Sequence, residues 1–139
     1  MHIYKGYSTF TQLDFSLSGL KSLDILNEQQ KPDLISNLLL NNNKLNRLYK
    51  NDFYGFIQLN ELRLDFNEIE YLELNCFNSL NNLTILKLNN NQLTQLLTGQ
   101  FYNLINLKQL DLSRNEIKFI DAFNLPFLNL FHLLELDFE

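Results

Sequence analysis

The residues of this chain that could do chemistry are polar and aromatic side chains that fall between leucines at short, regular spacing. The stretch LKLNNNQLTQL, which begins at Leu86, sets three asparagines between leucines, and similar stretches carry carboxylates, lysine or arginine at the same places. Such side chains donate and accept hydrogen bonds and form ion pairs. They predict non-covalent contact with another molecule.

Candidates for catalysis and metal binding are weak. His2 and His132 have no cysteine or second histidine at ligand spacing, so no metal site is predicted. Cys76 is the single cysteine, which excludes an intrachain disulfide, and with no histidine near it we interpret it as structural. Isolated glycines offer no phosphate-binding loop, and the carboxylates are expected on an open sheet where no cleft perturbs their pKa. We therefore predict no enzyme activity and no cofactor.

Charge and hydrophobicity narrow the class of partner. The 139 residues carry a formal net charge of -5, whereas a nucleic-acid surface normally shows a basic excess on one face. No apolar run approaches the roughly 18–20 residues that span a bilayer, and the first residues, MHIYKGYSTFTQ, lack the apolar region of a signal peptide. These features predict no nucleic-acid partner and no membrane span within this chain.

A fixed repeat decides which side chains come together. Four segments fit L-x-L-x-x-N-x-[LI] and begin at residues 38, 62, 86 and 110, each 24 residues after the last. The first apolar column between them holds Phe53, Phe77 and Phe101. The period-two alternation predicts strands with Leu62 and Leu64 inward and Arg63 outward, and the later spacing of three predicts turn-rich or 3₁₀ segments. One repeat cannot bury its apolar face alone, so repeats must stack.

These residues and their spacing resemble the leucine-rich repeat proteins, specifically the typical 24-residue class of Toll-like receptors, Slit-type guidance proteins and other animal extracellular proteins. The resemblance implies the α/β fold class: a right-handed leucine-rich repeat solenoid with a parallel β-sheet on the concave face and irregular or 3₁₀ segments on the convex face. Strands are expected near residues 12–16, 37–41, 61–65, 85–89, 109–113 and 133–137, in a single domain of residues 1–139.

One asparagine recurs where the chain leaves each predicted strand. This column holds Asn43, Asn67, Asn91 and Asn115. Backbone groups buried at a bend need partners, and an amide side chain has both donors and an acceptor. In the family this column is the asparagine ladder, so we interpret these four residues as structural. Asn89 and Asn90 fall on outward positions, where they are free to contact solvent or a ligand.

Both ends of the sequence interrupt the repeat. Tyr4, Tyr7 and Phe10 have the spacing of the convex columns, which predicts that Met1 lies within the convex arc of an earlier repeat. At the other end LELDFE fits a strand without the asparagine turn. Solenoids need polar caps, and none is recognised. Our hypothesis is an internal fragment of a longer protein. The alternative is a small protein with degenerate terminal repeats or with uncapped ends that self-associate.

Outward strand residues supply the predicted binding surface, because they form a continuous ribbon across the sheet. The candidate partner-binding residues are Arg63, Asp65, Phe66, Lys87, Asn89 and Asp111. Rim charges that steer association and an aromatic residue that anchors it favour a protein partner. The alternative is that these charges only confer solubility. The triplet from Asn82 to Thr84 is a glycosylation sequon, meaningful only in a secreted chain.

These observations predict a non-catalytic protein-protein interaction module that binds a protein ligand or co-receptor on its concave face. The resemblance implies a cell-surface receptor or a secreted adhesion or recognition protein, located outside the cell or at its surface. The alternative is an intracellular, cytoplasmic scaffold or adaptor, which agrees with one cysteine and no signal sequence. A third possibility is a recognition segment fused to a catalytic domain elsewhere, since fold alone does not decide function.

Overall fold

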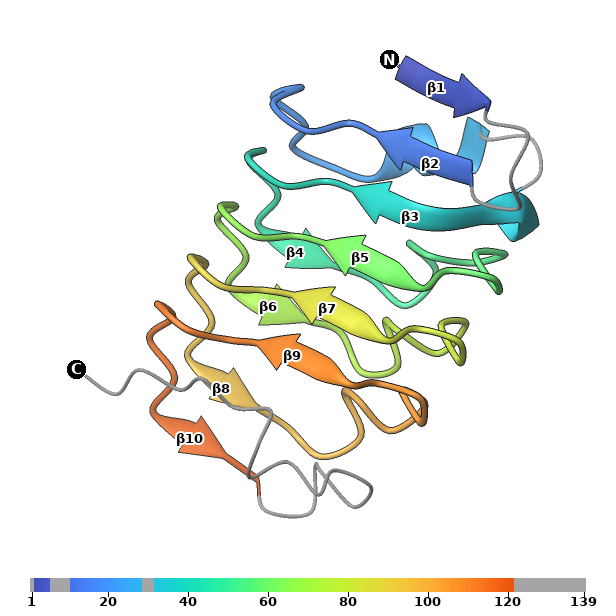
Figure 1. Cartoon of the computed structure of the whole chain (residues 1–139). Helices are drawn as coiled ribbons and strands as arrows, with labels where there is room; N and C mark the ends of the chain where they lie inside the picture. Colours follow the sequence, from blue (N-terminus) through green and yellow to red (C-terminus); the bar gives the residue numbers. More distant parts are fainter. Residues whose placement is uncertain (1, 6–10, 29–31, 122–139) are drawn as a thin grey trace.

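The chain forms a β-solenoid of about four turns, each stacked on the one before it (Figure 1). The computed structural model describes residues 2–5, 11–28 and 32–121. Each of the repeating turns passes through one main sheet and then returns along the opposite side of the molecule. Residues 24 apart in sequence therefore lie side by side.

Within the described residues, the main sheet has six strands in the order β1-β2-β3-β5-β7-β9. They are β1 (His2–Lys5), β2 (Thr11–Asp14), β3 (Ile35–Leu39), β5 (Glu61–Arg63), β7 (Ile85–Lys87) and β9 (Gln109–Asp111). Pairing from β2 to β9 is parallel, and its register aligns Leu13, Leu38, Leu62, Leu86 and Leu110. These leucines are at most 2% exposed while most side chains beside them are half-buried. The period-two leucine spacing produces this alternation.

The strands of the main sheet are shorter than the leucine pattern predicts. β5, β7 and β9 end at residues 63, 87 and 111, two residues before the predicted ends at 65, 89 and 113. Backbone pairing nevertheless continues, because Leu64 N donates to Lys87 O at 2.9 Å and Phe66 N donates to Asn89 O at 3.1 Å. The hydrogen bonds thus run on to the point where the chain bends away. The strand predicted near 133–137 lies outside the described residues.

In the part of the chain that the structure describes, the opposite side of the solenoid carries four short strands that the sequence pattern does not predict. They are β4 (Arg47–Leu48), β6 (Tyr71–Leu72), β8 (Gln95–Leu96) and β10 (Phe119–Ile120), paired in parallel as β4-β6 and β8-β10. Each has two residues, too few to show an alternating pattern. Two 3₁₀ helices, η1 (Asp24–Glu28) and η2 (Pro32–Leu34), precede β3.

The helical part of the expected α/β class is represented only by these 3₁₀ helices in residues 2–5, 11–28 and 32–121, where no α-helix occurs. The apolar spacing of three residues explains this difference, since it suits 3₁₀ turns better than the 3.6-residue period of an α-helix. Within the same residues no helix combines the length and hydrophobicity that crossing a bilayer requires.

Phenylalanine rings and leucines fill the space between the two sides. Phe53, Phe77 and Phe101 come from three successive turns, and their ring centroids lie 6.0 and 5.8 Å apart. This spacing is in the range of favourable aromatic pairs. All three residues are at most 4% exposed. Because equivalent residues contact one another, each turn covers apolar surface of the next, and stacking stabilises the fold.

The amino-terminal strand corrects one prediction. His2–Lys5 form β1, antiparallel to β2 with Ile3 opposite Leu13, and not the convex arc predicted from Tyr4, Tyr7 and Phe10. Tyr7 and Phe10 themselves lie outside the described residues. Pairing with β2 satisfies backbone groups that an edge strand would leave open, which an arc would not. The edge of β2, predicted to be uncapped, is therefore covered.

Candidate functional site

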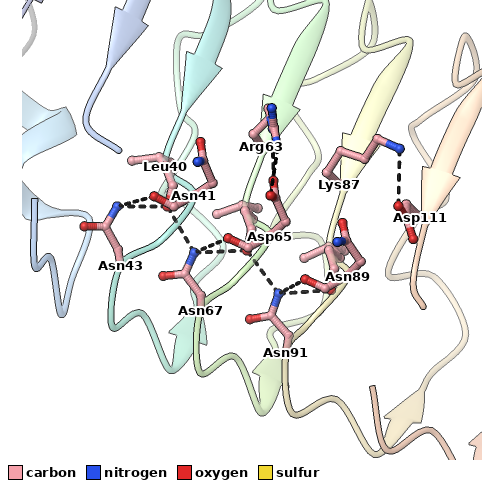
Figure 2. Close-up of polar contacts among 12 residues, drawn as sticks. Leu40, Asn41, Asn43, Arg63, Asp65, Asn67, Lys87, Asn89, Asn91 and Asp111 are labelled. Carbon is pink, nitrogen blue, oxygen red and sulfur yellow. Dashed lines mark hydrogen bonds and ion pairs between the residues drawn. The ribbon is translucent and has the colours of Figure 1, made fainter. Parts of the chain in front are cut away.

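A buried asparagine organises the bend that follows each strand of the main sheet (Figure 2). The column holds Asn43, Asn67, Asn91 and Asn115, of which the first three are 7–8% exposed. Asn67 shows the pattern. Its Nδ2 donates to Leu64 O in its own turn and to Leu40 O in the preceding turn, both at 3.0 Å, and its Oδ1 accepts from Leu45 N at 3.1 Å.

Successive asparagines share their acceptors. Leu64 O accepts from Asn67 and Asn91, both at 3.0 Å. Leu88 O accepts from Asn91 and Asn115, both at 2.9 Å. A buried backbone group without a partner costs roughly 1–3 kcal/mol. These amides are therefore occupied in holding one turn to the next, and they are not available to a ligand.

The residue before each of these asparagines has a left-handed backbone, and so does Leu17, which precedes Ser18 at the same repeat position. The φ angles are between 54° and 57° at Leu17, Asn42, Phe66, Asn90 and Arg114. Asparagine tolerates this conformation, whereas for other side chains it costs roughly 1–2 kcal/mol. Phe66 is nevertheless 50% exposed, so its burial does not offset that cost fully. The same backbone angle recurs at the equivalent residue of the other bends, so what distinguishes Phe66 is an exposed aromatic side chain at this position.

Arg63 and Asp65 form a bidentate ion pair on the sheet (Figure 2). Nε of Arg63 donates to Oδ1 at 3.0 Å and Nη2 donates to Oδ2 at 2.8 Å. The sequence places both side chains outward, but Asp65 is 2% exposed while the Arg63 side chain is 41% exposed. The hydrogen bonds to Asp65 are the main cause that raises the pKa of Arg63. A partner can therefore contact the guanidinium, whereas the carboxylate lies behind it.

A second ion pair joins β7 to β9. Nζ of Lys87 lies 3.3 Å from Oδ2 of Asp111, and Ser113 donates to Oδ1 through its backbone N at 3.1 Å and its hydroxyl at 2.7 Å. Burial raises the pKa of Asp111, but the hydrogen bonds from Ser113 and Lys87 outweigh it, so the pKa is lowered. Arg63 and Lys87, which are register partners, are thus both paired with carboxylates. This part of the sheet is not an unneutralised basic patch.

Two amide side chains flank Asp65 on the neighbouring turns (Figure 2). Asn41 and Asn89 are half-buried, and within the described part of the chain neither side chain makes a hydrogen bond. An amide has two donor hydrogens and an acceptor, so each can bind a peptide group or a polar side chain. Asn41 is not among the residues predicted from sequence, although its equivalence to Asn89 in the repeat is a usable signal.

We call the accessible part of this surface the sheet-face site. It consists of Asn41, Arg63, Phe66, Lys87 and Asn89, with the carboxylates of Asp65 and Asp111 holding the two basic side chains. The structure therefore brings together all six candidate partner-binding residues, but it divides them by role. Two carboxylates act as internal partners, and the other four residues lie at the exposed or half-buried surface.

Polar groups on the opposite side hold the turns together, and the sequence pattern did not identify them. Gln100 is 4% exposed, its Nε2 donates to Leu72 O at 2.8 Å, and its Oε1 accepts from Leu97 N at 2.8 Å. Cys76 has the equivalent place one turn earlier and is 1% exposed. Burial is the main cause that raises the pKa of its thiol. Because the thiolate is the nucleophilic form, Cys76 is poorly suited to catalysis.

An open hollow of about 330 Å³ is a second candidate site. It is lined by Glu70, Tyr71, Gln92, Thr94 and Glu116, beside β6 and β8. The two glutamates make it acidic. Among the residues that the structure describes, no cluster of three or more histidine, cysteine, aspartate or glutamate side chains is placed to hold a metal ion. The sheet-face site is the stronger candidate, because it combines amide side chains without hydrogen-bond partners in the described residues, ion-paired basic residues and an exposed aromatic ring.

Comparison with known proteins identifies the repeat. A family model described as leucine rich repeat matches residues 81–138, while the search of curated proteins found no match. The Toll structure from the Drosophila Toll–Spatzle complex aligns with a TM-score of 0.64 and 34% identity, over 66% of this chain and 12% of that chain. The TLR13–ssRNA13 complex aligns with a TM-score of 0.63 and 24% identity, over 83% and 19%. This chain thus spans less than a fifth of the length of either.

Stacked turns, a parallel sheet and a repeated bend define the chain as a parallel-strand β-solenoid with a leucine core. It belongs to the leucine-rich repeat proteins. At 24% identity the likeness to TLR13 shows the fold alone.

Proposed function

We propose that this chain is a non-catalytic protein-binding module of a cell-surface or secreted recognition protein, and that its sheet-face site contacts a protein ligand or co-receptor. The observation that carries the proposal is Phe66, a half-exposed aromatic side chain held in a strained bend within a polar surface. Aromatic anchors surrounded by polar groups are typical of the residues that dominate protein interfaces. We take the sheet as the concave face of the solenoid.

The polar side chains of the sheet-face site support the same function as Phe66. Arg63 uses two of its N–H donors on Asp65 and keeps the others for a partner. Because the ion pair already fixes the guanidinium, binding need not pay for its ordering. The amides of Asn41 and Asn89 add adaptable donors and acceptors on either side. The site therefore suits a partner with an apolar side chain surrounded by peptide groups.

Charge favours a protein over a nucleic acid as the partner. The net charge is -5, and both basic residues of the site are paired with carboxylates, so few cations remain to neutralise phosphates. The Toll structure that this chain resembles at 34% identity was solved in complex with Spatzle. That likeness supports a recognition role and a location outside the cell or at its surface.

Affinity capture with matched variants tests the proposal. The full chain is used as bait for proteins secreted by the source organism, and the captured protein is purified and titrated by calorimetry. Phe66→Ala should weaken binding at least tenfold, about 1.4 kcal/mol. Ile57→Ala is the control. Ile57 is as exposed as Phe66, at 51%, but it lies before β5, whereas Phe66 lies after β5. Equal loss for both variants, or no loss for Phe66→Ala, would reject the sheet-face site.

A further inference from the structure

The turn between β6 and β7 carries a modification signal at its surface. Asn82, Leu83 and Thr84 form an N-x-T triplet, the acceptor sequence for N-linked glycans. Leu83 is buried at 0%, whereas Asn82 is exposed and Thr84 is half-buried. Leu83 therefore packs the middle of the triplet into the core, while the side chain of Asn82 lies at the solvent-exposed surface.

Asn106 shows what an asparagine at the position of Asn82 does when it is not part of an N-x-T triplet. Asn106 is the equivalent of Asn82 one turn later, and both side chains make the same contact: Asn82 Nδ2 donates to Ile57 O and Asn106 Nδ2 donates to Asn81 O, each at 2.8 Å. Lys108 stands where the triplet would need serine or threonine. The contact made by asparagine thus does not depend on the residue two positions later, and the hydroxyl of Thr84 makes a separate contact, donating to Asn60 O at 3.1 Å and to Asn60 Oδ1 at 2.7 Å.

We propose that Asn82 is an N-glycosylation site of this chain. The proposal rests on the secreted or cell-surface function proposed above, because the transferase acts in the secretory lumen. The donor is a lipid-linked oligosaccharide diphosphate. Nδ2 of Asn82 loses a proton and forms a bond to the anomeric carbon of the sugar, while the bond between that carbon and the diphosphate oxygen breaks and the lipid diphosphate leaves.

The folded structure accommodates the product. Glycosylation replaces one of the two amide hydrogens of Nδ2 and leaves the other, so one N–H remains that can donate to Ile57 O. The glycan would extend from a turn that lies between two exposed isoleucines, Ile57 at 51% and Ile105 at 64%. It would cover apolar surface that otherwise faces water.

The glycan would also leave the sheet-face site open. Asn82 precedes the first residue of β7, whereas Phe66 follows the last residue of β5. Parallel strands place their amino ends along one edge of the sheet and their carboxyl ends along the other. Asn82 and Phe66 are therefore at opposite edges, and modification of one is compatible with partner binding at the other.

Cell-free translation into microsomes tests the site directly. The full chain is given an amino-terminal secretion signal, and only translocated, protease-protected chains are scored for a mobility shift that an N-glycosidase removes. Wild type should carry one glycan, and Asn82→Gln and Thr84→Ala should carry none. Lys108→Thr should carry two, because it completes the triplet at Asn106.

The assay separates this proposal from the proposed function. Translocated wild-type chains without a glycan at Asn82 would overturn the proposal, whether or not Lys108→Thr is modified at Asn106. Mass spectrometry of the glycosidase-treated peptide, in which the modified asparagine becomes aspartate, assigns the site. Failure of Phe66→Ala to weaken partner binding would instead reject the sheet-face site and leave this result unchanged.

Discussion

At the scale of single residues, asparagines two positions apart in the repeat have different roles. Asn67 bonds four backbone groups from two turns at a buried bend. Asn91 is the equivalent of Asn67 in the next turn, and Asn89 lies two residues before it. Asn89 is half-buried and makes no side-chain hydrogen bond within the described part of the chain. Burial and bonding, not residue type, therefore determine which asparagines stabilise the fold.

Asn67→Ala should lower the free energy of unfolding by roughly 2–4 kcal/mol. The variant leaves the buried Leu45 N–H without its acceptor, a cost of about 1–3 kcal/mol, and also removes the net-stabilising hydrogen bonds that Nδ2 donates. Urea unfolding followed by circular dichroism measures the change. Asn89→Ala is the matched control and should stay within about 0.5 kcal/mol of wild type. Similar losses for the two variants would contradict the division of roles.

Phe66→Asn should separate stability from binding. Asparagine tolerates the left-handed backbone at this position, where φ is 54°, so the variant should be more stable by up to about 1 kcal/mol. Partner affinity should fall because the anchor is lost. The reciprocal variant Asn90→Phe, at a φ of 55°, should lose stability by about the same amount. A destabilised Phe66→Asn chain would show that Phe66 is retained for packing instead.

At the scale of elements, the leucine spacing predicted strands in stacked repeats, and the resemblance to leucine-rich repeat proteins implied their parallel pairing in a solenoid. Period two selects a strand face, and the constant 24-residue offset forces equivalent strands into register. The strands on the opposite side could not be predicted, because two residues show no period. The burial of Asp65 could not be predicted either, since alternation places it outward and does not show its ion pair with Arg63. The left-handed bend had a signal in Asn42 and Asn90, which occupy the position of Phe66.

The ion pair between β7 and β9 should make the stability of the chain sensitive to acid. Asp111 has a lowered pKa, so near the ordinary value of 3.8 the unfolded chain binds more protons than the folded chain. Stability then rises with pH through this window and is lost as pH falls through the folded pKa. Asp111→Asn should be less stable than wild type at pH 7, and the difference should shrink below about pH 4.

The source of that lowered pKa can be tested separately. Ser113→Ala removes the hydroxyl that donates to Asp111 at 2.7 Å but keeps the carboxylate and Lys87. An NMR titration of the Asp111 carboxyl group should then show a higher pKa than in wild type. An unchanged pKa would mean that the backbone N–H of Ser113 and Lys87 suffice to hold the carboxylate ionised.

At the scale of the whole molecule, the solenoid is stabilised by contacts between successive turns. The aromatic stack, the shared carbonyl acceptors and the parallel ladders each join one turn to the next. A group buried between turns is exposed only when neighbouring turns separate. Cys76, 1% exposed beside the stacked ring of Phe77, is a natural probe of that separation.

Cys76 should therefore react with a thiol reagent only when turns separate. In the folded chain its modification should be far slower than that of an exposed thiol, because burial both blocks access and raises the pKa of the thiol. The dependence of the modification rate on denaturant should match that of global unfolding, since local opening exposes less surface and gives a smaller slope. Gln58→Cys in a Cys76→Ala chain supplies the exposed reference. A shallow slope for Cys76 would show that this turn opens on its own, and that coupling between turns is weaker than their shared core implies.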